Sequence, residues 1–202
     1  MRYAKKIPPA DKELRERLLA EGWKRLKEPS NLVAAILLSA PFMVVNGIIS
    51  LAIAYYLYPP FREAINLNGF SLTINGVKLL LYVVGVFIFL AIHEFIHACF
   101  IPDVLKSDKT YWGINGLFGF VSTAEKIKKG RYLIISVMPF ILLSLVLPFI
   151  LKFMGWLNGY TVFLCLINAA GSCVDCLNIC LIAIQVPRGA YIVSNGWETY
   201  FK

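Results

Sequence analysis

Four long apolar runs dominate the chain, and short stretches of charged and polar residues separate them. The runs cover about residues 31–58, 77–101, 132–157 and 160–186. A helix needs roughly 20 consecutive apolar residues to cross the hydrocarbon core of a bilayer, which is about 30 Å thick. The pattern therefore predicts an all-α membrane protein with four transmembrane helices.

The segments between the runs carry three weaker structural signals. Residues 10–28 combine leucines and a tryptophan with many charges, which predicts an amphipathic helix at the membrane surface. Residues 111–123 are rich in aromatic, β-branched and glycine residues, which predicts short strands in a β-hairpin-like loop. Two Asn-Gly pairs within residues 66–78 predict a second hairpin, in the loop between the first two runs.

Basic residues are concentrated on one side of the predicted membrane domain. Of the 20 lysines and arginines, 17 lie in residues 1–30, 106–131 and 187–202. The positive-inside rule makes this side cytoplasmic, so both termini are predicted to be cytoplasmic in an integral protein of the cell membrane. This orientation and the attraction of anionic lipids explain the net charge of +8, and we expect no nucleic-acid partner.

The overall composition agrees with a membrane-embedded chain. Only 16% of the residues are charged and 58% are hydrophobic, which excludes an ordinary water-soluble domain. The five cysteines lie in or beside the apolar runs, so we predict no disulfide framework. The expected organisation is a cytoplasmic amphipathic segment at residues 1–30, a four-helix membrane domain at residues 31–186 and a cytoplasmic tail at residues 187–202.

The second apolar run contains the only two histidines of the chain, His93 and His97. Residues four apart on a helix project from the same face, as two ligands of one metal ion must. Glu94 lies between them, where its carboxylate can accept a proton from an activated water and later deliver it to a leaving amine. Ionisable groups at membrane depth are costly, so this triplet predicts a functional zinc site.

A catalytic zinc ion usually has three protein ligands and one water, so a third ligand is needed from another run. Asp175, in the last run, lies at a similar depth, and its negative charge would offset part of the charge of the metal. A thiolate is the open alternative, because Cys173, Cys176 and Cys180 share one helix face in the same run.

Two pairs of residues are predicted to contact a substrate. Asn168 and Ser172 precede Asp175 on the same helix face, where they can orient this ligand, hold a substrate backbone or simply join two helices. Phe120 and Val121 lie in the predicted strand loop, whose edge can bind an extended peptide through main-chain hydrogen bonds. The alternative role of this loop is to seal the site from lipid.

Three segments of the chain resemble a known family. The motif HEFIH, the basic segment KKGRYLIISVMP and the segment NAAGSCVD resemble the small membrane proteins classed as putative zincin peptidases, over roughly residues 75–200. More distantly, the chain is similar to the site-2 protease class, which pairs HExxH with an aspartate in a later membrane helix. The resemblance implies that His93, His97 and Asp175 bind zinc and that Glu94 is the catalytic base. The local sequence differs from the site-2 pattern, because Cys176 and not a glycine follows the aspartate.

The sequence therefore predicts a zinc metallopeptidase that hydrolyses a peptide bond in a membrane protein or peptide substrate. A zinc-binding membrane scaffold or chaperone for partner helices is the alternative, since it would need the ligands but not Glu94. A transporter with an ionisable relay fits less well, because no inverted repeat is found in the sequence. The sequence specifies neither the substrate nor the oligomeric state.

Overall fold

The computed structural model describes residues 1–66, 75–115 and 118–202. Within them, four helical segments are long and apolar enough to cross a membrane: Val33–Leu57, Gly76–Phe100, Lys129–Phe153 and Gly159–Gln185. Their ends differ from those of the predicted runs by only a few residues. The prediction of four apolar helices of membrane-spanning length is confirmed. The hairpin predicted in the loop between the first two runs lies largely outside the described residues.

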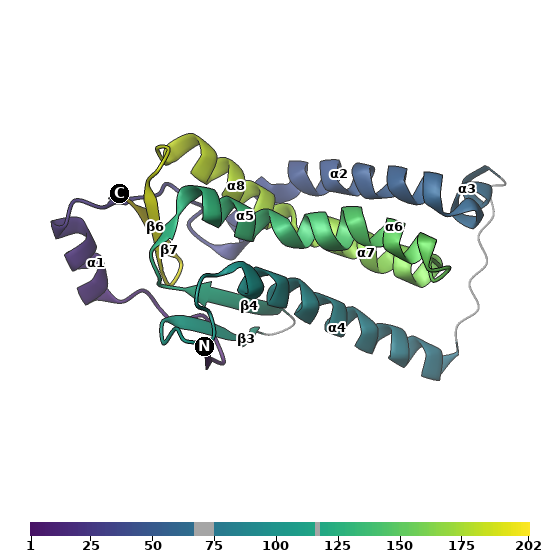
Figure 1. Cartoon of the computed structure of the whole chain (residues 1–202), viewed down its shortest axis with the longest axis horizontal. Helices are drawn as coiled ribbons and strands as arrows, with labels where there is room; N and C mark the ends of the chain where they lie inside the picture. Colours follow the sequence, from purple (N-terminus) through teal and green to yellow (C-terminus); the bar gives the residue numbers. More distant parts are fainter. Residues whose placement is uncertain (67–74, 116–117) are drawn as a thin grey trace. The chain divides into compact units, whose positions relative to one another are not determined.

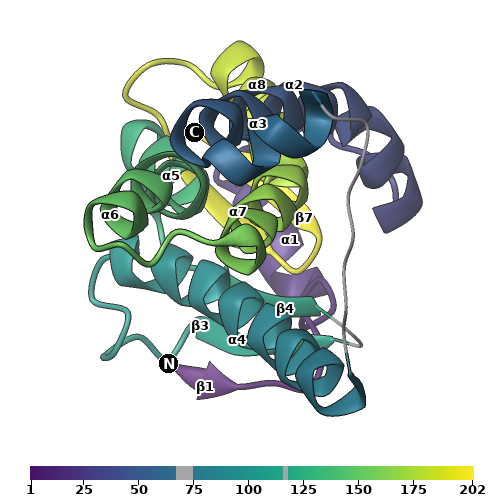
Figure 2. The same ribbon diagram turned by 90° about the vertical axis from the view of Figure 1, so that its right-hand side faces the viewer.

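The described chain divides into two compact units that interleave along the sequence. The first, here called the sheet unit, comprises Met1–Ser39, Glu94–Met138 and Val174–Lys202. The second, here called the helical unit, comprises Ala40–His93 and Pro139–Cys173. Figures 1 and 2 label the α-helices and most of the strands.

Long apolar helices make up the helical unit. It contains most of α2 (Leu32–Leu57), α3 (Pro59–Asn66), most of α4 (Gly76–Phe100) and α7 (Gly159–Gly171). The buried amide of Asn46 in α2 donates a hydrogen bond to the carbonyl of Ala169 in α7 (3.1 Å). The Tyr160 hydroxyl in α7 donates to the carbonyl of Tyr82 in α4 (2.7 Å), and the two rings stack. These polar contacts fix α7 against α2 and α4 where apolar packing alone would allow sliding.

The third and fourth membrane-length helices are not regular α-helices. The third consists of α5 (Lys129–Pro139), a π-helix, η1 (Phe140–Val146), and α6 (Leu147–Phe153). The fourth consists of α7 and α8 (Cys173–Gln185), which meet at Ser172. A capping box starts α7, because Asn158 accepts from the amide of Thr161 and the Thr161 hydroxyl accepts from the amide of Asn158.

A three-stranded sheet forms part of the sheet unit. It contains β1 (Arg2–Tyr3), β3 (Thr110–Asn115) and β4 (Phe118–Thr123) in the order β1-β3-β4. Strands β3 and β4 are antiparallel, and β1 adds parallel to β3 (Figure 2). The strand pair predicted at residues 111–123 is therefore present, and β4 is an edge strand.

A second sheet corrects the all-α prediction. It contains β2 (Lys24–Arg25), β5 (Ile127–Lys128), β6 (Tyr191–Asn195) and β7 (Glu198–Phe201), in the order β2-β7-β6-β5. The predicted tail is thus a hairpin, and its Val193 and Tyr200 pack with Leu18 of α1 (Lys12–Ala20) and with Trp23. The predicted N-terminal helix is shorter than expected, because Gly22 has a φ of +83° and the next residues pair with β7.

Basic side chains cap the last turns of two helices in the sheet unit. Arg131 Nε donates to the carbonyl of Phe100 at the end of α4 (2.7 Å). Lys129 Nζ donates to the carbonyls of Ala183 (3.0 Å) and Val186 (2.6 Å) at the end of α8. Positive groups stabilise helix C-termini, where carbonyls lack partners. The start of α5 thereby holds the ends of the two helices that carry the predicted metal ligands.

Candidate metal centre

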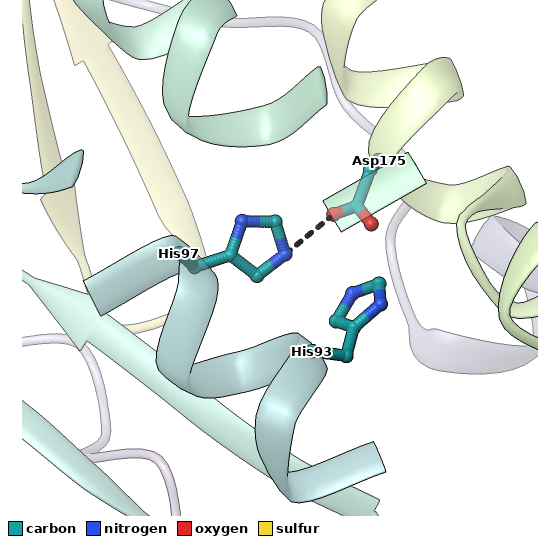
Figure 3. A group of neighbouring side chains, drawn as sticks. All are labelled: His93, His97 and Asp175. Carbon is teal, nitrogen blue, oxygen red and sulfur yellow. Dashed lines mark ion pairs between the residues drawn. The ribbon is translucent and has the colours of Figure 1, made fainter. Parts of the chain in front are cut away.

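His93, His97 and Asp175 come together in the structure. The two histidines lie one turn apart on α4, and Asp175 lies in the first turn of α8. Each offers one ligand atom, and these atoms all lie within 4.8 Å of one another. His97 Nε2 is 3.5 Å from Asp175 Oδ1, and Figure 3 shows the His93 ring beside this pair.

The second nitrogen of each imidazole ring is held by an oxygen of the protein. His97 Nδ1 lies 2.8 Å from the backbone carbonyl oxygen of Ile135, which can only accept, so Nδ1 is the donor. His93 Nδ1 lies 2.8 Å from Oδ1 of Asn168. Donation from Nδ1 leaves Nε2 with a lone pair, which is the state needed for metal binding.

The fourth membrane-length helix is interrupted three residues before Asp175. The amide and the hydroxyl of Ser172 both donate to the carbonyl of Asn168 (2.9 Å each), which closes the last turn of α7. Helix α8 then begins at Cys173, with Asp175 in its first turn. The side chains of His97 and Asp175 are 13% and 22% exposed, so the group has access from outside while remaining largely enclosed.

The donor set suits a zinc ion, and one pair of ligand atoms is spaced as two zinc ligands would be. Two ligands about 2.05 Å from tetrahedral zinc lie about 3.3 Å apart, close to the 3.5 Å between His97 Nε2 and Asp175 Oδ1. Two imidazoles and one carboxylate leave the fourth position of a tetrahedral site for water or substrate. His97 and the carboxylate of Asp175 both lie where such an ion would contact them.

The geometry favours the carboxylate over a thiolate as the third ligand. Cys173, Cys176 and Cys180 all lie in α8, beside Asp175 in the sequence. Among the described residues, the group of metal-ligating side chains around the two histidines includes Asp175 and no cysteine.

Glu94 lies against strand β4. A Cβ atom added at Gly119 would lie 2.8 Å from Cγ of Glu94, which is closer than real Cβ atoms come to their neighbours. Only glycine allows this approach, so β4 passes directly over the side chain predicted to be the catalytic base. No signal in the sequence predicted this contact, apart from the general richness of this loop in glycine.

The side chains of Phe120 and Val121 point into the protein. Phe120 is buried, and its ring lies over Gly113 of β3. Val121 packs against the hydrophobic cluster that contains Ile101 and Ile135. Both side chains are therefore engaged in packing within the sheet unit.

The register of β3 and β4 shows which peptide groups face the open edge. The amide of Ala124 donates to the carbonyl of Lys109 (3.0 Å), and hydrogen-bonded pairs alternate along an antiparallel ladder. Phe120 is therefore hydrogen-bonded to its partner in β3, whereas the N–H and C=O groups of Gly119 and Val121 point away from β3. No described strand pairs with this edge.

Asn168 and Ser172 are fully enclosed, with 1% and 0% of their surfaces exposed. The amide group of Asn168 contacts His93, the carbonyl of Pro139 (3.2 Å) and the hydroxyl of Ser144 (2.8 Å). Sequence reasoning identified Asn168 but not Ser144. The available signal for Ser144 was a serine in the middle of an apolar run, five residues after a proline.

Comparisons with known proteins place the chain in a family. No curated protein and no solved structure matches it. A family model described as putative zincin peptidase matches residues 86–191, which is more than half of the chain. The matched segment contains His93, Glu94, His97 and Asp175. The resemblance inferred from the sequence motifs is thereby confirmed, and the chain belongs to the family of putative zincin peptidases.

Proposed function

We propose that this protein is a zinc-dependent peptidase of the cell membrane, with His93, His97 and Asp175 as the metal ligands. The observation that carries the proposal is the convergence of the three side chains: their ligand atoms lie within 4.8 Å of one another, and Nδ1 of each imidazole ring contacts an oxygen of the protein. A pair of histidines with a purely structural role does not need an oxygen of the protein at Nδ1 of both rings. Metal-binding histidines do, because the hydrogen bond of one nitrogen orients the other.

The chemistry divides between the metal and Glu94. Zinc, when bound, would supply a Lewis acid that activates water and polarises the scissile carbonyl. The carboxylate of Glu94 accepts the proton of the attacking water and delivers it to the nitrogen of the leaving amine. Helix α4 places Glu94 directly after His93, so the base is held beside the ligands by backbone geometry alone. Contact with β4 at Gly119 restricts the side chain further.

The open edge of β4 is the proposed substrate-binding element. A scissile peptide bond must be extended for attack, because a helix shields its own backbone. The N–H and C=O groups of Gly119 and Val121 can pair with an extended substrate segment, as in β-augmentation. Glu94 contacts β4 at Gly119, so a strand bound there would lie beside the catalytic base. The substrate class is a membrane protein or peptide with an extended segment near the bilayer surface.

Asn168 and Ser172 act as positioning residues in this proposal. Their polar groups are engaged with His93 and with the backbone that leads to Asp175, and both side chains are enclosed. A role in orienting the ligands uses every contact that they make. Direct substrate binding would require these contacts to break.

The decisive experiment separates catalysis from metal binding. Purified protein and a Glu94→Gln variant would be assayed for zinc content and for cleavage of a library of quenched single-span peptides in lipid nanodiscs. We expect equal zinc content and a loss of cleavage of at least about a hundredfold in the variant, as for removal of a general base. Cleavage that survives in Glu94→Gln would contradict the mechanism. Zinc binding without cleavage in either protein would favour a scaffold.

A further inference from the structure

The π-helix of the third membrane-length helix contains a fully buried serine. η1 (Phe140–Val146) follows directly after Pro139, and Ser144 within it is 0% exposed. A proline removes one backbone donor, and the wider π-helical turn leaves carbonyl groups available for other partners. π-Helical segments occur often at functional sites, where they bring side chains or carbonyls to unusual positions.

Ser144 is fixed as a hydrogen-bond acceptor toward Asn168. Its hydroxyl donates to the backbone carbonyl of Cys165 (3.0 Å), and this uses its single hydrogen. Asn168 Nδ2 lies 2.8 Å from Ser144 Oγ and 3.2 Å from the carbonyl oxygen of Pro139. Both neighbours can therefore only accept from Asn168, and all these residues belong to the helical unit.

Two acceptors on one side of the amide determine which way the amide points. The NH₂ group must face Ser144 and Pro139, so Oδ1 must face His93. A reversed amide would place its oxygen against the carbonyl oxygen of Pro139, which has no hydrogen to donate, and the Ser144 hydroxyl could donate to it only by giving up its bond to Cys165. Unpaired polar groups are costly in such a low-dielectric interior. With Oδ1 facing the ring, His93 Nδ1 has to be the donor, and Nε2 keeps its lone pair.

We propose that Ser144 is a positioning residue that acts through Asn168 to hold His93 as the Nδ1–H tautomer. The order of contacts is the Cys165 carbonyl, the Ser144 hydroxyl, the Asn168 amide and the His93 ring. The relevance of this tautomer to zinc rests on the proposed function, but the tautomer itself is a property of the metal-free protein. His97 needs no such chain of contacts, because its Nδ1 meets a backbone carbonyl that cannot reverse.

The two-histidine composition makes a direct test practicable. Metal-free protein labelled with ¹⁵N-histidine contains only two labelled rings, and a His97→Asn sample assigns the signals of His93. At a pH where His93 is neutral, its bare and protonated nitrogens have well-separated ¹⁵N shifts. The native protein should show His93 with protonated Nδ1 and bare Nε2.

Ser144→Ala removes one of the two acceptors, and Ser144→Cys replaces it with a weaker acceptor of similar shape. We expect a mixture of His93 tautomers in Ser144→Ala and a smaller shift in the same direction in Ser144→Cys. The signals of His97 should stay unchanged in both. Zinc affinity, measured by competition with a chelator, should fall about tenfold or more in Ser144→Ala, as for other residues that orient metal ligands.

Ser50→Ala is the matched control, because Ser50 is a buried serine of α2 in the same unit. This control should leave both rings and the zinc affinity unchanged. Unchanged His93 signals in both Ser144 variants would overturn the proposal, and so would an equal change in Ser50→Ala. The ring signals are read without metal or substrate, so a protein that proves inactive as a peptidase would still return a clear answer on Ser144.

Discussion

Gly119 and Glu94 are in such close contact that any larger residue at position 119 would have to displace one of them. A Cβ atom there would lie 2.8 Å from Cγ of Glu94. The contact joins the strand proposed to bind substrate to the residue proposed to act as base. It therefore offers a way to displace Glu94 without changing its chemistry.

Gly119→Ala should impair catalysis while leaving the metal ligands intact. The added methyl group has to push Glu94 or β4 away, and a displacement of about 1 Å can lower a catalytic rate about a hundredfold. Zinc content should remain that of the native protein. Gly130→Ala is the matched control, because nothing lies within 4 Å of a Cβ atom at that position. Equal cleavage rates in the two variants would show that the position of Glu94 does not limit the reaction.

The ligand assignment predicts about one zinc ion per chain, as one four-coordinate site requires. His93→Ala, His97→Ala and Asp175→Ala should each strongly reduce zinc content, measured by elemental analysis of purified protein. Cys176→Ala changes the neighbour of Asp175 and should retain the metal. If Cys176→Ala loses zinc and Asp175→Ala keeps it, the third ligand is a thiolate.

Proline substitutions in β4 test substrate binding at the open strand edge. The amide of Val121 points toward the open edge, so Val121→Pro removes a donor available to substrate without removing one from the β3–β4 ladder. We expect cleavage of a nanodisc-reconstituted peptide to fall about tenfold or more, with unchanged zinc content. Full activity in Val121→Pro would remove the strand-docking role.

Phe120→Pro should behave differently from Val121→Pro. The register pairs Phe120 with Gly113 in a hydrogen-bonded position, whereas Val121 occupies a non-hydrogen-bonded position. Proline there removes a ladder hydrogen bond, so limited proteolysis should show a destabilised hairpin in this variant. Equal protease resistance of the two proline variants would contradict the assignment of Phe120 to a hydrogen-bonded position and Val121 to a non-hydrogen-bonded position.

The proposed topology can be tested apart from the metal site. On a cysteine-free background, Asn66→Cys should react with a membrane-impermeant thiol reagent applied outside the cell, and Lys106→Cys should not. Both side chains are exposed, so access to the reagent depends on the membrane and not on the fold. The expectation rests on the 17 of 20 basic residues assigned to the other side. The reverse labelling pattern would mean that both termini lie outside the cell.

Part of the architecture was readable from local signals but was not predicted. A glycine between two short strand-forming runs is a typical hairpin signal, and Gly196, with a φ of +62°, and Trp197 form the turn that joins β6 to β7 in the segment that was expected to be a simple tail. Strands β2 and β5 have two residues each and gain their pairing from these longer partners. Such short strands carry no pattern of their own, so only the assembled sheet reveals them.

The sequence by itself determined the features that depend on local geometry or on solvent. Apolar runs of about 20 residues determined four membrane-length helices, because backbone groups must be satisfied within each segment in a bilayer. The spacing of four determined that His93 and His97 share a helix face, since about 100° of rotation per residue is a property of any α-helix. Glu94 directly follows His93 in the sequence, so the same helical geometry places the proposed base beside the proposed ligands.

Only the tertiary structure decided which groups from other segments meet those residues. Asp175 and Cys176 are adjacent in the sequence, yet about 100° of helical rotation separates them, and only Asp175 lies in the group around the two histidines. The contact of Gly119 with Glu94 depends on how β4 packs against α4. The orientation of the Asn168 amide depends on the carbonyl of Pro139, at the end of α5, and on the hydroxyl of Ser144 in the π-helix. Contacts between segments arise from the packing of the whole chain, and no local pattern encodes them.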